Sequence, residues 1–201
     1  MSIWAQEFGN DYTRRNAQSD IEGRAGIWRV LLPRHVESIL EVGANVGHNL
    51  EAISQFSQAD LYAVEPNEMA REGLYSTLDW LPRGHIREDY ADKLTFEDSQ
   101  VDLAFTCGVL IHIAPDKLLP SMKEIHRVSG RYIICGEYFS PKEEMVPYRG
   151  IDDALWRRDY GSLWLDNFSD LHCIGTMFAW KRQTPFDNLV FWVMEKGPQR
   201  H

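Results

Sequence analysis

The stretch Ile39-Leu40-Glu41-Val42-Gly43-Ala44-Asn45-Val46-Gly47-His48 decides the fold of this chain. A short apolar strand ends in an acidic residue, and a loop with two glycines then opens onto a helix. Gly43 and Gly47 carry no side chain, so the backbone can approach a ligand closely at both positions. The next expected strand ends just before Glu65, whose carboxylate can accept both ribose hydroxyls of a nucleoside. The stretch therefore predicts a nucleoside-type ligand at the ends of two neighbouring strands.

Strands and helices alternate along the chain on both sides of this motif. The expected strands cover residues 38–42, 61–64, 85–87, 101–106 and 132–135, and the expected helices cover 21–32, 48–56, 67–78 and 116–128. This alternation is typical of a parallel sheet with helices on both faces, which binds ligands beyond the carboxyl ends of its strands. Two segments rich in aromatic and β-branched residues, 170–181 and 188–196, predict a closing antiparallel hairpin. The fold class we expect is a doubly wound, mostly parallel α/β sheet closed by that hairpin.

The N-terminal region is expected to be helical. Ser19 and Glu22 have the spacing of a capping box, which predicts a helix start. Trp4, Phe8 and Tyr12 are spaced by four residues, as on one face of a helix. We expect one domain in three parts: a helical cover over residues 1–35, a cofactor-binding half over 36–140, and a substrate-side segment with a helix at 152–159 and the hairpin over 141–201.

Composition restricts the partners. The 201 residues include 30 acidic and 21 basic side chains and carry a net charge of −9, which argues against nucleic acid and anionic membranes and favours a cationic ligand. The N-terminus does not resemble a signal peptide, and no apolar run is long enough for a membrane span. Cys107, Cys135 and Cys173 lack metal-site spacing, so we expect no metal and read them as buried thiols of a cytoplasmic protein.

Two common nucleotide motifs do not fit the glycine loop. A dinucleotide fold needs G-x-G-x-x-G counted from Gly43, but Asn45 and His48 occupy the second and third glycine positions. A phosphate-binding P-loop is also missing, because no Gly-Lys-Ser or Gly-Lys-Thr follows. A pyrophosphate would in addition lie close to the carboxylate of Glu41. A dehydrogenase is therefore disfavoured and remains a third alternative.

The pattern Glu-x-Gly-x-x-x-Gly resembles the first motif of class I S-adenosylmethionine-dependent methyltransferases, and Asn45 stands where that family usually has glycine. The cofactor is a phosphate-free cation, which suits an acidic loop. The resemblance covers about residues 38–135 and implies a seven-stranded Rossmann-like fold, with Glu65 on the ribose and Asp89 on the adenine amino group. It implies a cofactor site formed by Glu41, Gly43, Asn45, Gly47, Glu65, Pro66, Asp89, Tyr90, Thr106, Cys107 and Gly108.

The flanking segments resemble one group of that superfamily. Residues 8–16, residues 158–161 with 164–166, and the Phe-Asp-Asn-Leu turn at 186–189 look like the methylases associated with pseudaminic acid biosynthesis. That resemblance implies a small-molecule acceptor, such as a sugar or a nonulosonic acid pathway intermediate. It leaves the methylated atom, oxygen or nitrogen, and the oligomeric state open.

Other candidates come from position in the expected fold. Glu137 follows a strand at its carboxyl end and is one candidate base; His112 is the other, because it matches a histidine common in the small-molecule enzymes of the superfamily that the chain resembles. Tyr12 and Arg15 lie one helical turn apart, so both can face the cofactor, and Arg15 can bind the methionine carboxylate. Three further residues are candidates for substrate binding: Tyr138, Arg157 and Arg158.

Structural explanations compete with several of these assignments. Glu41 could cap its own loop, His112 could be a hydrogen-bonded structural residue, and Arg157 and Arg158 could lie on a solvated helix face. A nucleic-acid base methyltransferase is disfavoured because Asn/Asp-Pro-Pro-aromatic is missing after the strand at 101–106. The alternatives that stay open are a non-catalytic S-adenosylmethionine-binding or scaffold protein, and a methyltransferase for an amino acid or natural-product acceptor.

Overall fold

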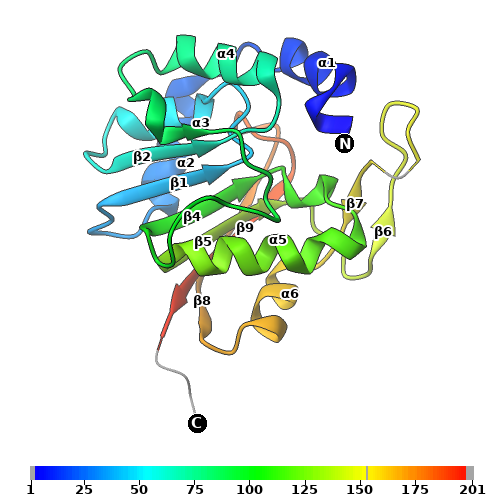
Figure 1. The fold of residues 1–201 in the computed structure, drawn as a ribbon. Helices are drawn as coiled ribbons and strands as arrows, with labels where there is room; N and C mark the ends of the chain where they lie inside the picture. The colour runs from blue at the N-terminus through cyan, green and yellow to red at the C-terminus, as the bar shows by residue number, and fades with distance from the viewer. Residues whose placement is uncertain (1–2, 153, 198–201) are drawn as a thin grey trace.

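The computed structural model describes residues 3–152 and 154–197 (Figure 1). Seven strands form one sheet in the order β3-β2-β1-β4-β5-β9-β8. The strands are β1 (Ser38–Val42), β2 (Asp60–Val64), β3 (Ile86–Arg87), β4 (Val101–Cys107), β5 (Ser129–Glu137), β8 (Leu171–Ala179) and β9 (Leu189–Lys196). The first five run parallel, and β9 pairs antiparallel with both β5 and β8. The predicted fold class is confirmed.

Helices cover both faces of the sheet (Figure 1). They are α1 (Glu7–Arg15), α2 (Ile21–Leu31), α3 (His48–Ser54), α4 (Glu68–Thr77), α5 (Pro115–Val128) and α6 (Tyr160–Asn167). Three short 3₁₀ turns are η1 (Ile3–Ala5), η2 (Arg83–His85) and η3 (Leu110–His112). A small two-stranded ribbon, β6 (Glu144–Met145) with β7 (Trp156–Arg157), completes the described elements.

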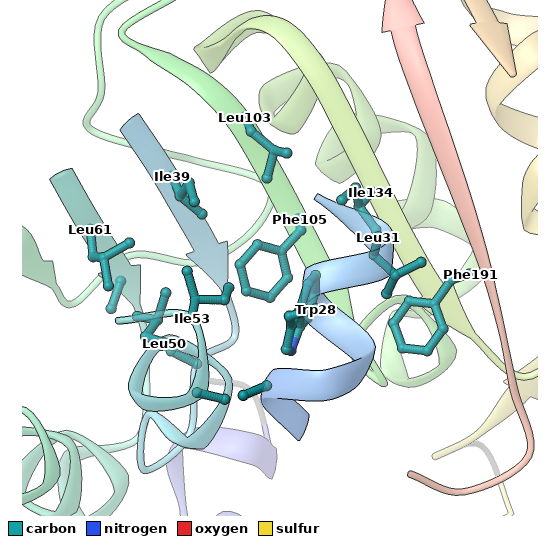
Figure 2. Close-up of a cluster of buried hydrophobic side chains, with 14 of the residues drawn as sticks. Trp28, Leu31, Ile39, Leu50, Ile53, Leu61, Leu103, Phe105, Ile134 and Phe191 are labelled. Carbon is teal, nitrogen blue, oxygen red and sulfur yellow. The ribbon is translucent and has the colours of Figure 1, made fainter. Parts of the chain in front are cut away.

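The core is divided by the sheet into two apolar clusters, because successive side chains of a strand point to opposite faces. Ile39 of β1 belongs to the cluster under α2 and α3, whereas Leu40 belongs to the cluster under α5 and α6. Trp28 of α2 is fully buried, with its ring centroid 4.5 Å from that of Phe105 and 6.0 Å from that of Phe191 (Figure 2). Helix α2 is thus a layer of the core.

The capping box expected at Ser19 and Glu22 is wrong. Asp20 is the N-cap of α2, and its Oδ1 accepts the Gly23 amide at 2.9 Å. The Ser19 hydroxyl instead accepts a hydrogen bond from Arg24 Nε. Serine and aspartate are both favoured N-caps, so two neighbouring candidates cannot be distinguished by spacing alone.

The helix expected at residues 152–159 is also wrong, and residue 153 lies outside the described part of the chain. Strand β7 occupies Trp156–Arg157, and α6 starts at Tyr160, where Asp159 caps the Ser162 amide at 3.0 Å. The three cysteines are free thiols, but Cys173 is exposed rather than buried, because it lies on the edge strand β8. Within the described residues, every helix is too short or too polar to span a lipid bilayer.

Candidate active site

The glycine loop between β1 and α3 has a left-handed backbone at three positions. The φ angles are +80° at Gly43, +48° at Asn45 and +88° at Gly47. A Cβ at Gly43 would lie 2.6 Å from Cγ2 of Val109, so glycine is needed there for space as well as for conformation. Asn45 tolerates this conformation better than most residues, which explains how it replaces a glycine. The amides of Gly43 and Ala44 donate to the Val64 carbonyl at 2.8 and 3.0 Å, and thereby fix the loop against β2.

Two cavities meet above this loop, at the carboxyl ends of the strands. We call the first the acidic cavity; its volume is about 620 Å³, and it is lined by Glu65, Pro66, Asp89 and Tyr90, among others. We call the second the arginine cavity; its volume is about 550 Å³, and Arg15, Arg24 and Arg149 line it. The residues that line both are Tyr12, Asn45, Gly108 and His112. A ligand that spans this junction would contact residues from three separate segments of the chain: α1, the glycine loop and the turn after β4.

Glu65 is held in place by backbone amides on either side. One oxygen, Oε2, accepts the Asn45 amide at 2.8 Å, and Oε1 accepts the Asn67 amide at 2.8 Å. Burial raises the pKa of Glu65, and the two amides oppose that shift. The carboxylate is 8% exposed and lines the acidic cavity, where oxygen lone pairs not used by the amides can accept ribose hydroxyls.

Asp89 lies in the same cavity and is 8% exposed. Its Oδ2 accepts both the amide and the hydroxyl of Thr95, each at 2.8 Å. No hydrogen bond of Oδ1 is seen within the described residues, so that oxygen is available to accept from an amino group. Tyr90 beside it is 38% exposed and offers a flat apolar face. The structure thus brings Glu65, Asp89 and Tyr90 to one cavity, as the sequence predicted.

His112 lies at the junction of the two cavities. Its Nδ1 is 2.6 Å from the Ala154 carbonyl, so Nδ1 carries the proton and Nε2 is an acceptor. Burial lowers the pKa of His112 to about 4, which keeps the ring neutral at pH 7. The ring lies 4.2 Å from Trp4, 6.3 Å from Tyr12 and 5.3 Å from Tyr148, measured between centroids. An aromatic wall therefore surrounds one neutral acceptor nitrogen.

Three predicted cofactor residues line neither cavity: Glu41, Gly47 and Thr106. Glu41 is 2% exposed, and its Oε1 accepts Asn49 Nδ2 at 2.7 Å. Its Oε2 is buried without a hydrogen bond, and burial raises the pKa of Glu41 to about 8. Thr106 is 1% exposed in β4. Cys107 and Gly108, the next two residues, do line the arginine cavity.

Glu137 does not have the accessibility that a base needs. It is fully buried, and its carboxylate accepts the amides of Val109, Leu110 and Ile111 at 3.2, 3.0 and 3.3 Å. Burial raises its pKa to about 7. The geometry assigns Glu137 a structural role, in which it anchors the turn that carries His112. The expectation that Glu137 takes a proton from substrate is therefore not supported.

The two arginines predicted to bind substrate are not on a helix and do not line the arginine cavity. Arg158 is 2% exposed, pairs with Glu143 at 2.6 Å and donates to Tyr160 Oη at 3.2 Å. Arg157 is exposed on β7, with its guanidinium 5.9 Å from the Tyr138 ring centre. Tyr138 lines the arginine cavity, and its hydroxyl donates to Asp187 at 2.8 Å. Of these three candidates, the structure brings Tyr138 alone to the arginine cavity.

Helix α1 closes the site from the N-terminal side. Tyr12 lines both cavities, and Arg15 lines the arginine cavity, as expected. The Thr13 hydroxyl lies 3.2 Å from Asn45 Oδ1, and His48 Nε2 lies 3.1 Å from the Asn16 carbonyl. These contacts bind α1 to the glycine loop.

Sequence reasoning missed several residues of the site: Arg24, Asn49, Tyr148 and Arg149. Arg24 lies on a helix that looked purely structural, and Asn49 follows the motif without belonging to it. Arg24 Nη1 and Trp28 Nε1 both donate to Asn49 Oδ1, at 2.7 and 3.2 Å, so this asparagine joins the core to the cavity. The one available sign for Arg149 was Gly150 after it, because glycine often marks a tight turn.

Comparison with known proteins agrees with this geometry. Residues 39–130 match the methyltransferase domain family. No curated protein shows significant sequence similarity to the chain. Three solved structures are similar in fold. The Burkholderia thailandensis 1,6-didemethyltoxoflavin-N1-methyltransferase, solved with its substrate and S-adenosylhomocysteine, has a TM-score of 0.70 and 12% identity over 97% of this chain and 84% of that one.

The second is a methyltransferase from Aquifex aeolicus that depends on S-adenosylmethionine, with a TM-score of 0.68 and 12% identity over 92% of this chain and 97% of that one. The third is a methyltransferase from Leishmania major that also depends on S-adenosylmethionine. It has a TM-score of 0.68 and 20% identity over 87% of this chain and 71% of that one. The chain carries a methyltransferase domain, and the predicted class, an S-adenosylmethionine-dependent methyltransferase, is confirmed.

Proposed function

We propose that the protein transfers a methyl group to an oxygen or nitrogen of a small molecule bound in the arginine cavity. The observation that carries this proposal is the junction: Asn45, Gly108, His112 and Tyr12 line both cavities. A cofactor with its adenosine in the acidic cavity would have its reactive end at the junction, next to an acceptor in the other cavity. The cofactor, when bound, supplies an electrophilic methyl group on a sulfonium.

The residues of the acidic cavity fit the nucleoside. Glu65 would accept the ribose hydroxyls, Asp89 Oδ1 the adenine amino group, and Pro66 and Tyr90 would pack on the adenine. Gly43 lines the acidic cavity and allows the backbone to approach the cofactor, and the Asn45 amide is held by Glu65. We assign buried Glu41 a positioning role: its Oε1 accepts Asn49 Nδ2 at 2.7 Å, and Asn49 lines the arginine cavity.

The chain's contribution to the reaction is alignment, exclusion of water and acceptance of a proton. The rings of Trp4, Tyr12 and Tyr148 around His112 exclude water from the junction and confine the acceptor. His112 Nε2 orients the acceptor's hydroxyl or amine and receives its proton. A pKa of about 4 makes His112 a weak base, so orientation is its larger contribution. Arg15 would bind the methionine carboxylate.

We further propose a single domain in the cytoplasm, with a sugar or a nonulosonic acid pathway intermediate as acceptor. Support for the acceptor class comes from the resemblance of the flanking segments to the pseudaminic acid-associated methylases. The open alternatives are an amino acid or natural-product acceptor, or cofactor binding without turnover.

Calorimetric titration with S-adenosylhomocysteine tests the cofactor site. We expect binding to the unaltered protein and at least tenfold weaker binding to Glu65→Ala, with Glu72→Ala on the exposed side of α4 as the matched control. Incubation with cell extract and S-adenosylmethionine tests turnover, which releases S-adenosylhomocysteine. Equal affinity of Glu65→Ala would refute the cofactor assignment, and binding without turnover would establish the non-catalytic alternative.

A further inference from the structure

The arginine cavity is cationic in a chain whose net charge is −9. Arg15, Arg24, Arg149 and Lys181 line it, and Asp187 is the one acidic residue among the described lining residues. Asp187 is already paired with Lys181, at 2.6 Å. Among the ion pairs of residues 3–152 and 154–197, none involves any of the three arginines. The cavity therefore holds three uncompensated guanidinium charges.

The nearest buried acid does not compensate Arg24. Arg24 Nη1 donates to Asn49 Oδ1, and Asn49 Nδ2 donates in turn to Glu41. Because burial raises the pKa of Glu41 to about 8, that carboxyl is mostly protonated and neutral at pH 7. Arg24 also lies over Phe186, with its guanidinium carbon 4.5 Å from the ring centre. Its partners are thus neutral groups.

Arg149 is held at the cavity by a turn that disfavours arginine. Tyr148 and Ile151 exchange two backbone hydrogen bonds at 2.9 and 3.1 Å, and the two residues between them have φ of +52° at Arg149 and +84° at Gly150. Two positive φ angles define a type I′ turn, where asparagine or glycine is favoured at the first position. An arginine there costs conformational free energy, which a role for its side chain would offset.

Arg149 and His112 both lie close to the ring of Tyr148. Its guanidinium carbon lies 5.7 Å from the Tyr148 ring centre, and the Tyr148 ring lies 5.3 Å from the His112 ring. Arg149, Tyr148 and His112 all line the arginine cavity, to which the loop between β6 and β7 contributes Tyr148 and Arg149.

The cofactor cannot neutralise this cavity. Its sulfonium and ammonium are positive and its carboxylate is negative, so the bound molecule adds positive charge. Its one carboxylate can pair with one arginine, for which Arg15 is our candidate. At least two guanidinium groups stay without a counter-ion, and an anion from the acceptor would relieve their mutual repulsion.

On the basis of the proposed function, we propose that the methyl acceptor is a small anion whose carboxylate or phosphate is bound by Arg149 beside Tyr148 and His112. The planar guanidinium binds either group through two parallel hydrogen bonds. The tyrosine rings at the cavity suit a flat or cyclic body attached to that anion.

The test uses three small probes of similar size: benzoate, phenyl phosphate and the neutral benzamide. Each is titrated by calorimetry into the protein saturated with S-adenosylhomocysteine. We expect benzoate or phenyl phosphate to bind at least tenfold more tightly than benzamide, and Arg149→Gln to remove that preference. The matched control is Arg34→Gln, an exposed arginine in the turn before β1, at the opposite end of the strands, which should retain it.

Two results would overturn the inference: equal binding of benzamide and the anions, or an unchanged preference in Arg149→Gln. Affinity of Arg149→Gln for S-adenosylhomocysteine is measured in parallel and should stay within twofold of the unaltered protein; a larger loss would place Arg149 on the cofactor and also overturn the inference. Failure of the unaltered protein to bind S-adenosylhomocysteine would instead refute the proposed function, so the two failures are distinguishable.

Discussion

His112 Nδ1 lies 2.6 Å from the carbonyl oxygen of Ala154. Ala154 lies 42 residues further along the chain, just before β7, so the contact joins the turn after β4 to the small ribbon. A carbonyl can only accept, which fixes the proton on Nδ1 and leaves Nε2 as the acceptor at the junction. The ribbon therefore sets the protonation form of the residue that faces the substrate.

The first prediction concerns the titration of His112. We expect the neutral form with a proton on Nδ1 from pH 8 down to about pH 5, because burial lowers the pKa to about 4. Between pH 6.5 and 4 the unfolded chain binds more protons at His112 than the folded chain does. The contribution of His112 to stability is therefore present above pH 6.5 and is lost as the pH falls toward 4. Imidazole ¹⁵N chemical shifts in labelled protein measure the tautomer and the pKa. Titration near pH 6.5 would contradict the prediction.

The second prediction concerns Glu41 and has the opposite sign. Burial raises the pKa of Glu41 from 4.5 to about 8, so the folded state binds more protons than the unfolded one between those values. Stability from this group is complete below pH 4.5 and is lost as the pH rises to 8, by about 1 kcal/mol per pH unit. Glutamine cannot titrate, so the stability of Glu41→Gln relative to the unaltered protein should increase as the pH rises over this range. Urea unfolding at several pH values measures the difference; parallel curves would refute it.

The third prediction compares two glycines. Gly43→Ala places a Cβ 2.6 Å from Val109 in a backbone with φ of +80°, and should lower the free energy of unfolding by about 1–2 kcal/mol. Gly26→Ala in α2 meets no atom within 4 Å, and should raise stability by about 0.5–1 kcal/mol because alanine is the better helix former. Thermal unfolding measures both. If Gly43→Ala raised the free energy of unfolding as Gly26→Ala does, the loop geometry would not be required.

The fourth prediction compares neighbouring arginines on α1. Arg15 lines the arginine cavity, whereas Arg14 pairs with Glu7 and Asp11 on the exposed side. Arg15→Gln should weaken S-adenosylhomocysteine binding about tenfold or more, since a hydrogen bond to a charged group contributes about 1.5–3 kcal/mol. Arg14→Gln should leave the affinity unchanged. Calorimetry decides: similar affinities for the two variants would remove Arg15 from the cofactor site.

The fold and the acidic cavity could be predicted because their determinants are local. Alternating apolar segments define the strands, and the residues that follow parallel strands must meet at one edge of the sheet. Glu65 was found in this way, whereas Asp89 was implied by the resemblance to class I methyltransferases. Whether a carboxylate at that edge is accessible to a ligand depends on long-range contacts. Glu137 therefore looked like a base in the sequence, whereas in the structure it is bound to three amides.

Arginines were the hardest residues to assign for the same reason. Arg157 and Arg158 are adjacent and chemically identical, yet one is exposed and the other is buried against Glu143. Arg24 gave no pattern and Arg149 only a following glycine, because a cavity formed by α1, α2 and the 148–151 turn exists only after the chain has folded. The charge of the acceptor site thus follows from tertiary structure and not from any motif.

Helix α1 serves ligand binding rather than folding, although the bond between Thr13 and Asn45 attaches it to the glycine loop. Helix α1 buries little of itself, Gly9 and Thr13, whereas α2 places Trp28 in the centre of the core. We expect a chain that starts at α2 to fold around the same sheet. Without Tyr12 and Arg15 it would hold two open grooves in place of two walled cavities. Residues 3–16 therefore enclose the ligands and are not needed to form the sheet.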